Sequence, residues 1–106
     1  MKQKLYLPLP ALKALKKLGS DIRDARRRRR ITMALLSERA RISPDTLKQI
    51  EKGNPVTSVG GYASVLFSLG MTNRLGDIAD VRHDLTGQQL EEENLPKRVR
   101  MPKKRF

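Results

Sequence analysis

The chain has few residues that could perform covalent chemistry. Among its 106 residues there is one histidine, His83, and there is no cysteine. No Cys–His or Ser–His pair offers a nucleophile beside its base, and no cluster of side chains has the spacing of metal ligands. The sequence therefore predicts a protein that is not an enzyme and that needs neither a cofactor nor a metal. His83 is most simply interpreted as a surface residue.

Ionic chemistry has many candidate residues, and they are unevenly distributed. The net charge is +12. Residues 1–53 contain 15 Lys and Arg against 5 Asp and Glu, residues 54–96 contain 2 against 6, and residues 97–106 contain 6 and no acid. A run of five arginines, Arg26–Arg30, lies in the first of these stretches. Concentrated cations are typical of a surface that binds phosphate groups, and the alternative for such a run is a solvated face.

The elements that would position these cations are helices. Apolar residues three and four apart, from Leu12 to Ala25, predict a helix that starts near Pro10 and ends in the arginine run. The Gly19-Ser20 pair weakens the middle of this helix, which favours a regular helix from Ser20 with a packed turn before it. Residues 1–9 are predicted to form an extended arm.

Two shorter helices joined by a tight turn follow. Thr32 is suited to cap a helix that runs to Ala40. Ser43 is a second N-cap, and Pro44 follows it at the first helical position, where the missing N–H costs nothing. Gly53 is predicted to end this helix. Two short helices joined by a turn of about three or four residues form a helix-turn-helix.

The residues of this segment resemble the helix-turn-helix signature of the Xre/Cro family of DNA-binding proteins. The resemblance implies a structural ion pair between Arg26 of the first helix and Glu51 of the third. It also places Arg41 where the family has a turn glycine, and a non-glycine residue in a left-handed conformation costs about 1–2 kcal/mol. The matching residues are Thr32, Leu36, Ala40, Ile42-Ser43, Thr46-Leu47 and Ile50-Glu51-Lys52-Gly53.

The resemblance also implies which residues contact double-stranded DNA. The third helix would enter the major groove with its N-terminal end toward the bases. Amide, ammonium and carboxylate side chains can each pair with a base edge, whereas proline offers only apolar contact. The expected base-reading residues are Pro44, Asp45, Lys48 and Gln49. The residues expected to contact the DNA backbone are Thr32, Ser43, Arg28, Arg29, Lys52, Thr57 and Ser58.

The remaining helices complete an expected all-α, compact five-helix Xre/Cro-like domain with a flexible N-terminal arm and a basic C-terminal tail. A fourth helix follows Thr57 or Ser58 and ends at Gly70, with Tyr62 and Phe67 expected in the core. Thr72 is expected to cap a last short helix that carries Leu75, Ile78 and Ala79. Beyond the domain, the Thr86–Gln89 spacing predicts a capping box and a short helix to Glu93. The predicted divisions are an arm at 1–9, a DNA-binding domain at 10–82 and an extension at 83–106.

A narrower resemblance concerns the basic end of the chain. The Leu18–Arg29 pattern together with the ending LPKRVR is similar to HipB-type antitoxins. This resemblance implies a repressor that represses its own operon as a homodimer and binds a HipA-type serine/threonine kinase toxin, either one chain or split into two. The dimer contacts are expected around Met71, Leu75, Ile78 and Val81.

Two other functions are compatible with the sequence. A free-standing Xre-type transcriptional regulator would need only residues 10–82 and no toxin partner. A basic adaptor that binds RNA or an acidic protein would make Pro44, Asp45 and Gln49 unimportant. No apolar run approaches the roughly 20 residues that cross a membrane, and no signal-peptide core is present, so the sequence predicts a cytoplasmic protein that does not bind membranes.

Overall fold

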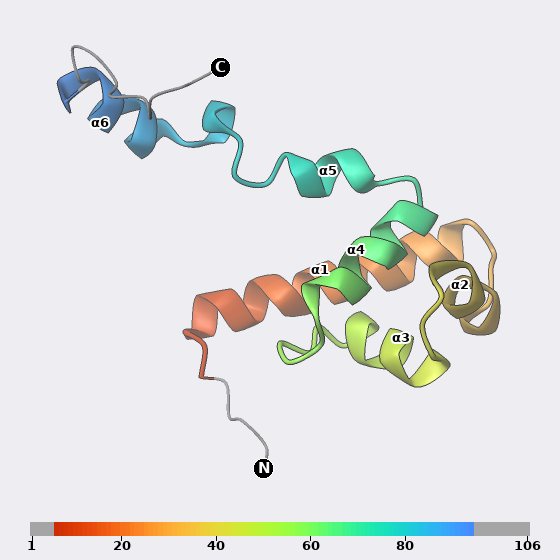
Figure 1. The fold of residues 1–106 in the computed structure, drawn as a ribbon. Helices are drawn as coiled ribbons and strands as arrows, with labels where there is room; N and C mark the ends of the chain where they lie inside the picture. The colour runs from red at the N-terminus through yellow and green to blue at the C-terminus, as the bar shows by residue number, and fades with distance from the viewer. Residues whose placement is uncertain (1–5, 95–106) are drawn as a thin grey trace, which may run out of the picture. The chain divides into compact units, whose positions relative to one another are not determined.

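The computed structural model describes residues 6–94, and every regular element among them is helical (Figure 1). The all-α fold class is therefore confirmed for this part of the chain. Predictions for the first five residues and for the basic tail after Asn94 lie outside the described residues. The helices are α1 (Leu9–Arg28), α2 (Met33–Ala40), α3 (Pro44–Glu51), α4 (Val59–Ser68), α5 (Thr72–Gly76), the 3₁₀ turn η1 (Val81–His83) and α6 (Leu85–Asn94).

The described chain divides into two units, one ending at Leu75 and the other beginning at Gly76. The predicted boundary of the DNA-binding domain lay seven residues later, after Arg82. The first unit contains α1 to α4 and most of α5, and it holds the buried core. None of the helices between Leu9 and Asn94 is both long and apolar enough to span a lipid bilayer.

Side-chain hydroxyls cap three helices of the first unit at the places that the sequence predicts. The Thr32 Oγ1 accepts a hydrogen bond from the Leu35 N–H at 3.0 Å at the start of α2. The Ser43 Oγ accepts one from the Thr46 N–H at 3.0 Å at the start of α3. For α4 the cap is Ser58 rather than Thr57. These bonds satisfy helix N–H groups that would otherwise lack a partner, which fixes where each helix begins.

The first four helices all end in the same way, with one residue in the left-handed conformation. At the end of α2, the Ile42 N–H donates to the Ser37 carbonyl at 3.0 Å and the Arg41 N–H donates to the Glu38 carbonyl at 3.1 Å. This is the Schellman arrangement, in which a left-handed residue satisfies the last carbonyls of the helix. The left-handed residues are Arg30, Arg41, Gly53 and Gly70, with φ of 55°, 58°, 74° and 79°.

The predicted helix start at Ser20 is wrong, because α1 runs without interruption through Gly19. A Cβ added to Gly19 would lie 2.5 Å from the Ile50 carbonyl oxygen and 2.6 Å from the Gly53 nitrogen. A Cβ added to Gly53 would in turn lie 2.5 Å from the Leu15 carbonyl oxygen. The two glycines therefore let the backbone of α1 lie directly against the end of α3.

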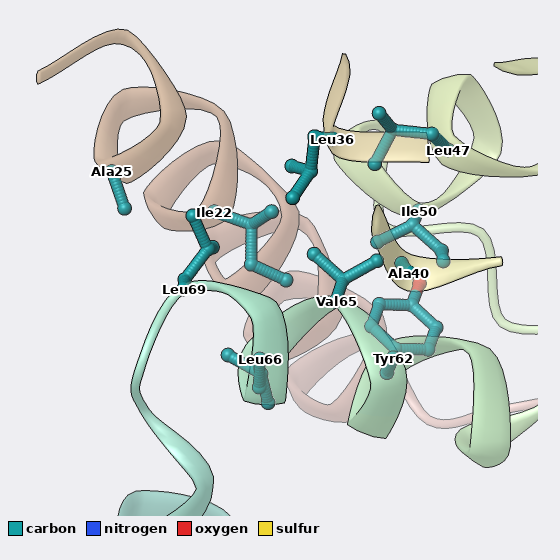
Figure 2. Packing of buried hydrophobic residues seen from close by; sticks show 10 residues of the cluster. All are labelled: Ile22, Ala25, Leu36, Ala40, Leu47, Ile50, Tyr62, Val65, Leu66 and Leu69. Atoms are coloured by element: carbon teal, nitrogen blue, oxygen red, sulfur yellow. The ribbon is translucent and has the colours of Figure 1, made fainter. Parts of the chain in front are cut away.

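The buried core of the first unit lies between α1, α2, α3 and α4 (Figure 2). Ile22 of α1, Leu36 of α2, Leu47 of α3 and Val65 of α4 are almost completely buried. Leucine, isoleucine, valine and alanine dominate, as the scarcity of aromatic residues requires. The ten core residues are Ile22, Ala25, Leu36, Ala40, Leu47, Ile50, Tyr62, Val65, Leu66 and Leu69.

Three expectations for the later helices need correction. Tyr62 is buried as predicted, but Phe67 is 71% exposed, because the core-facing positions of α4 are occupied by Val65, Leu66 and Leu69. The helix after Gly70 is only five residues long and includes Thr72 as its first residue, so it ends before Ile78. The cap of α6 is not Thr86, since the Asp84 carboxylate accepts the Gly87 N–H at 2.9 Å.

The second unit is held by local hydrogen bonds among exposed polar groups. Arg82 pairs with Asp77 and with Asp80, and the His83 Nε2 lies 2.9 Å from the Asp77 carboxylate. The Arg82 N–H and guanidinium stabilise the ionised carboxylate and lower the pKa of Asp80. His83 is thus a surface residue, as expected, and it has an acidic neighbour.

We predict that Gly19→Ala strongly destabilises the first unit, since the added methyl group would overlap the backbone of α3. Overpacking of this kind costs about 1–3 kcal/mol or more. The matched control is Gly60→Ala in α4, where the nearest non-neighbouring atom to the added Cβ is the Ser58 Oγ at 3.8 Å. The control should be neutral or stabilising by up to about 1 kcal/mol, because alanine favours helix. Urea unfolding measures both, and equal effects of the two substitutions would disprove the backbone contact.

Candidate nucleic-acid interface

One face of α3 carries the residues expected to read DNA bases. Leu47 and Ile50 are buried, so α3 turns its opposite side to solvent. A helix repeats every 3.6 residues, which places positions 44, 45, 48, 49 and 52 within one sector on that side. Pro44, Asp45, Lys48 and Lys52 are exposed, and Gln49 is half-buried. The structure thus brings all four expected base-reading residues to one face.

The expected ion pair between Arg26 and Glu51 is present and nearly enclosed. The Arg26 Nε donates to the Glu51 Oε2 at 2.7 Å and its Nη2 donates to Oε1 at 3.1 Å. The two side chains are only 11% and 6% exposed. The Arg26 Nη1 also donates to the Ile31 carbonyl at 3.2 Å. One guanidinium therefore joins α1, the end of α3 and the segment just before α2, which fixes α3 relative to the start of α2.

The loop between α3 and α4 is organised by Asn54. Its side-chain Nδ2 donates to the Gln49 Oε1 at 2.9 Å, and its Oδ1 accepts the Val56 N–H at 2.7 Å. Its carbonyl accepts the Tyr62 hydroxyl at 2.9 Å. Burial raises the pKa of Tyr62 above its ordinary value, and the protonated phenol donates this bond. Asn54 therefore determines where the loop and the Ser58 cap lie relative to α3.

Gln49 consequently has a structural contact that the order of residues does not indicate. Its Oε1 is already an acceptor for Asn54, and among the described residues no hydrogen bond engages its amide nitrogen. The amide can still donate to a base edge, and one lone pair of Oε1 remains. Substitution of Gln49 would change the loop as well as the face of α3. Lys48 is exposed and its ammonium has no partner in the described chain, so it is the cleaner residue for testing base contact.

The arginine run divides into residues with structural partners and residues that face solvent. The Arg29 guanidinium donates to the Ala25 carbonyl at 2.9 Å and to the Leu69 carbonyl at 3.1 Å. It therefore ties α1 to the end of α4, a contact for which the sequence offered no signal. Arg28, in the last turn of α1, is exposed and makes no side-chain hydrogen bond within residues 6–94. Of the two arginines expected at the DNA backbone, Arg28 is the one whose guanidinium makes no hydrogen bond within the described residues.

The expected backbone contacts otherwise lie at helix starts. Thr32, Ser43 and Ser58 are the exposed N-caps of α2, α3 and α4, where helix N–H groups and the helix dipole favour anions. Thr57 precedes the last of these and is half-buried. Among residues 6–94 no group of three or more His, Cys, Asp or Glu side chains could hold a metal ion. The arrangement presents helix N-termini, cations and amide groups, whose chemistry suits phosphates and base edges.

We predict that Arg26→Leu lowers the free energy of unfolding by about 3–5 kcal/mol, because it leaves the Glu51 carboxylate enclosed without a partner. The double variant Arg26→Leu/Glu51→Leu should be more stable than the single variant, since no unpaired charge remains. Urea unfolding of the wild type, both single variants and the double variant completes a thermodynamic cycle. Strictly additive effects would show that the pair contributes no coupling.

We predict that Arg41→Gly stabilises the chain by about 0.5–1 kcal/mol, because glycine removes the left-handed strain of arginine but has more conformational entropy to lose. The reverse change, Gly70→Ala, serves as the matched control, since a Cβ there meets no atom within 4 Å and only the strain is added. It should destabilise by a similar amount. Thermal unfolding followed by circular dichroism measures both, and a lower melting temperature for Arg41→Gly would contradict the prediction.

Comparisons with protein-family models, with curated proteins and with solved structures gave no match.

Proposed function

We propose that the first unit is an Xre/Cro-type helix-turn-helix that binds double-stranded operator DNA and represses transcription. The observation that carries the proposal is the exposed face of α3, whose residues at positions 44, 45, 48, 49 and 52 face solvent while the opposite side is buried in the core. A core-anchored helix with an exposed polar face is what a major groove accommodates.

The chemistry of this face suits base edges. The Lys48 ammonium can donate to guanine O6 and N7, the Gln49 amide can pair with adenine, and the Asp45 carboxylate can accept from cytosine N4. Pro44 can contact a thymine methyl. The rigid support behind the face matters as much as the side chains, because a base contact discriminates only where its donor is held in position. The Arg26–Glu51 pair and Asn54 supply that support.

Phosphate contacts would fix the protein on the DNA without reading sequence. The N-caps Thr32, Ser43 and Ser58 and the cations Arg28 and Lys52 are the candidates, all of them exposed. Arg29 is a weaker candidate, since its guanidinium already bonds two carbonyls. A unit of this size covers little of a major groove, so we propose a homodimer on a palindrome with half-sites about one helical turn apart.

We further propose that the protein acts as a HipB-like antitoxin that represses its own operon and binds a HipA-type kinase toxin, in one chain or two. Its support is the resemblance of the sequence pattern, together with the extension at 83–106, which a free-standing regulator would not need. The alternative is a free-standing Xre-type regulator without a toxin partner. Affinity purification of the full chain from its native cell, with identification of the bound proteins by mass, separates the two. A co-purifying kinase-like chain supports the antitoxin, and its absence favours the free-standing regulator.

Lys48→Ala is expected to relax base specificity at one position of the operator and to cost about 1–3 kcal/mol of binding energy there. The preferred site is first obtained by selection from a random DNA library, and affinities are then measured against that site and its single-base variants. Arg28→Gln is the comparison. It should weaken binding to every sequence alike. It should also reduce the slope of log affinity against log salt concentration by about one.

Two outcomes would contradict these assignments. If Lys48→Ala lowered affinity equally for all sequences, Lys48 would contact phosphate rather than a base. If the wild type selected no sequence from the library, the operator-binding function itself would be wrong, and a basic adaptor for RNA or an acidic protein would become the better account. Lys13→Ala, which removes an exposed cation of α1 remote in sequence from α3, controls for a general effect of charge.

A further inference from the structure

An open groove runs along α4 in the first unit. It has a volume of about 860 Å³ and is lined by α4 with its Ser58 cap, by the end of α2 with the turn that follows, by Thr46 of α3 and by α5. Its apolar lining includes Ala40, Ala63, Phe67 and Leu75. Phe67 is 71% exposed, although the other large residues toward the end of α4, such as Leu66 and Leu69, are buried. Phe67 lines the groove together with the other apolar residues of its lining, and a contiguous exposed apolar surface is typical of a site that another chain covers.

The rim of this groove is positively charged. Arg39, at the last turn of α2, and Arg41, in the turn that follows, both line it and are both exposed. Within residues 6–94 neither guanidinium makes a hydrogen bond or an ion pair, so both charges are available. Arg41 is held at φ 58° by the Schellman arrangement, which fixes the backbone beneath its side chain. An occupant should therefore combine apolar side chains with carboxylates.

The second unit has this chemistry. Three times in succession an aspartate directly precedes a large apolar residue, in Asp77-Ile78, Asp80-Val81 and Asp84-Leu85. Ile78, Val81 and Leu85 are 69%, 57% and 69% exposed. From Gly76 to Asn94 the chain has six Asp and Glu against one cation, Arg82. The local bonds of Arg82, of the Asp84 cap and of Gln88 to the Val81 carbonyl give this segment a defined shape without burying its apolar residues.

We propose that the groove along α4 receives the acidic, apolar segment 77–85 of a second copy of this chain, and that the exchange is reciprocal. Phe67 and Leu75 would contact the apolar residues, and Arg39 and Arg41 would face the exposed Glu91–Glu93 run, which makes no ion pair within residues 6–94. The three aspartates would add negative charge while keeping their local bonds to Arg82 and to the start of α6. The choice of a second copy over other acidic chains rests on the proposed function, because an operator-binding unit of this size acts as a dimer. Each copy contributes one groove and one segment, so two copies satisfy each other and the assembly stops at a dimer.

The test is the mass of the full chain in solution without DNA, measured by analytical ultracentrifugation over a range of concentrations. Phe67→Glu should weaken the dimer by about tenfold or more, since it places a charge in the apolar contact and brings an acid toward the aspartates. Val59→Glu is the matched control, because Val59 is an equally exposed apolar residue of α4 that does not line the groove. It should leave the dimer unchanged. Circular dichroism shows whether each variant folds.

A mixing experiment distinguishes reciprocal docking from other dimers. Phe67→Glu should prevent the groove from accepting a segment. The double variant Val81→Glu/Leu85→Glu should prevent the segment from entering a groove. Each variant alone should be largely monomeric, whereas an equimolar mixture should recover a heterodimer through the one intact groove and the one intact segment. A wild-type monomer, a Phe67→Glu dimer of unchanged strength, or a mixture that stays monomeric would each overturn the proposal.

The outcomes also separate this proposal from the proposed function. Operator selection is measured on the same proteins in a separate experiment. A chain that dimerises through the groove but selects no DNA sequence would disprove operator binding and leave the docking intact. A chain that selects an operator while Phe67→Glu remains fully dimeric would disprove the docking alone.

Discussion

The first unit depends on direct contact between the backbones of α1 and α3. Gly19 and Gly53 remove the side chains that would separate the two helices, and the Arg26–Glu51 pair holds them together about two helical turns farther along α1. Because the guanidinium also bonds the Ile31 carbonyl, the entry to α2 is fixed by the same group. Much of the geometry of the exposed α3 face therefore depends on two missing side chains and one nearly buried charge pair.

Sequence reasoning predicted the features that depend on local chemistry. The starts of α2, α3 and α4 follow from hydroxyl caps and from Pro44, and these signals act within a few residues. The Arg26–Glu51 pair followed from resemblance, since nothing local joins residues that are 25 positions apart. The exposed face of α3 followed from its period, because Leu47 and Ile50 leave only one side for the core.

The features that sequence reasoning missed depend on contacts across the fold. Helix propensity predicts that Gly19 weakens the helix, whereas its role is set by the Ile50 carbonyl, which a sequence cannot place. Hydrophobicity predicts that Phe67 belongs to the core, but the register of α4 turns it outward. Arg29 and Asn54 form their key bonds with backbone carbonyls or a distant amide, and such partners leave no pattern in the residue order.

Under the proposed function, the bond between Gln49 and Asn54 limits how the residues of the exposed α3 face can change. Position 49 belongs at once to the exposed face and to the loop that carries the α4 cap. A replacement at position 49 alters the loop as well as the exposed face of α3. A replacement that leaves the loop unchanged therefore requires a compensating change at position 54. The Lys48 side chain makes no such hydrogen bond within residues 6–94. The two neighbouring positions of one face are therefore unequally free to vary, and substitutions should accumulate at position 48 before they reach position 49.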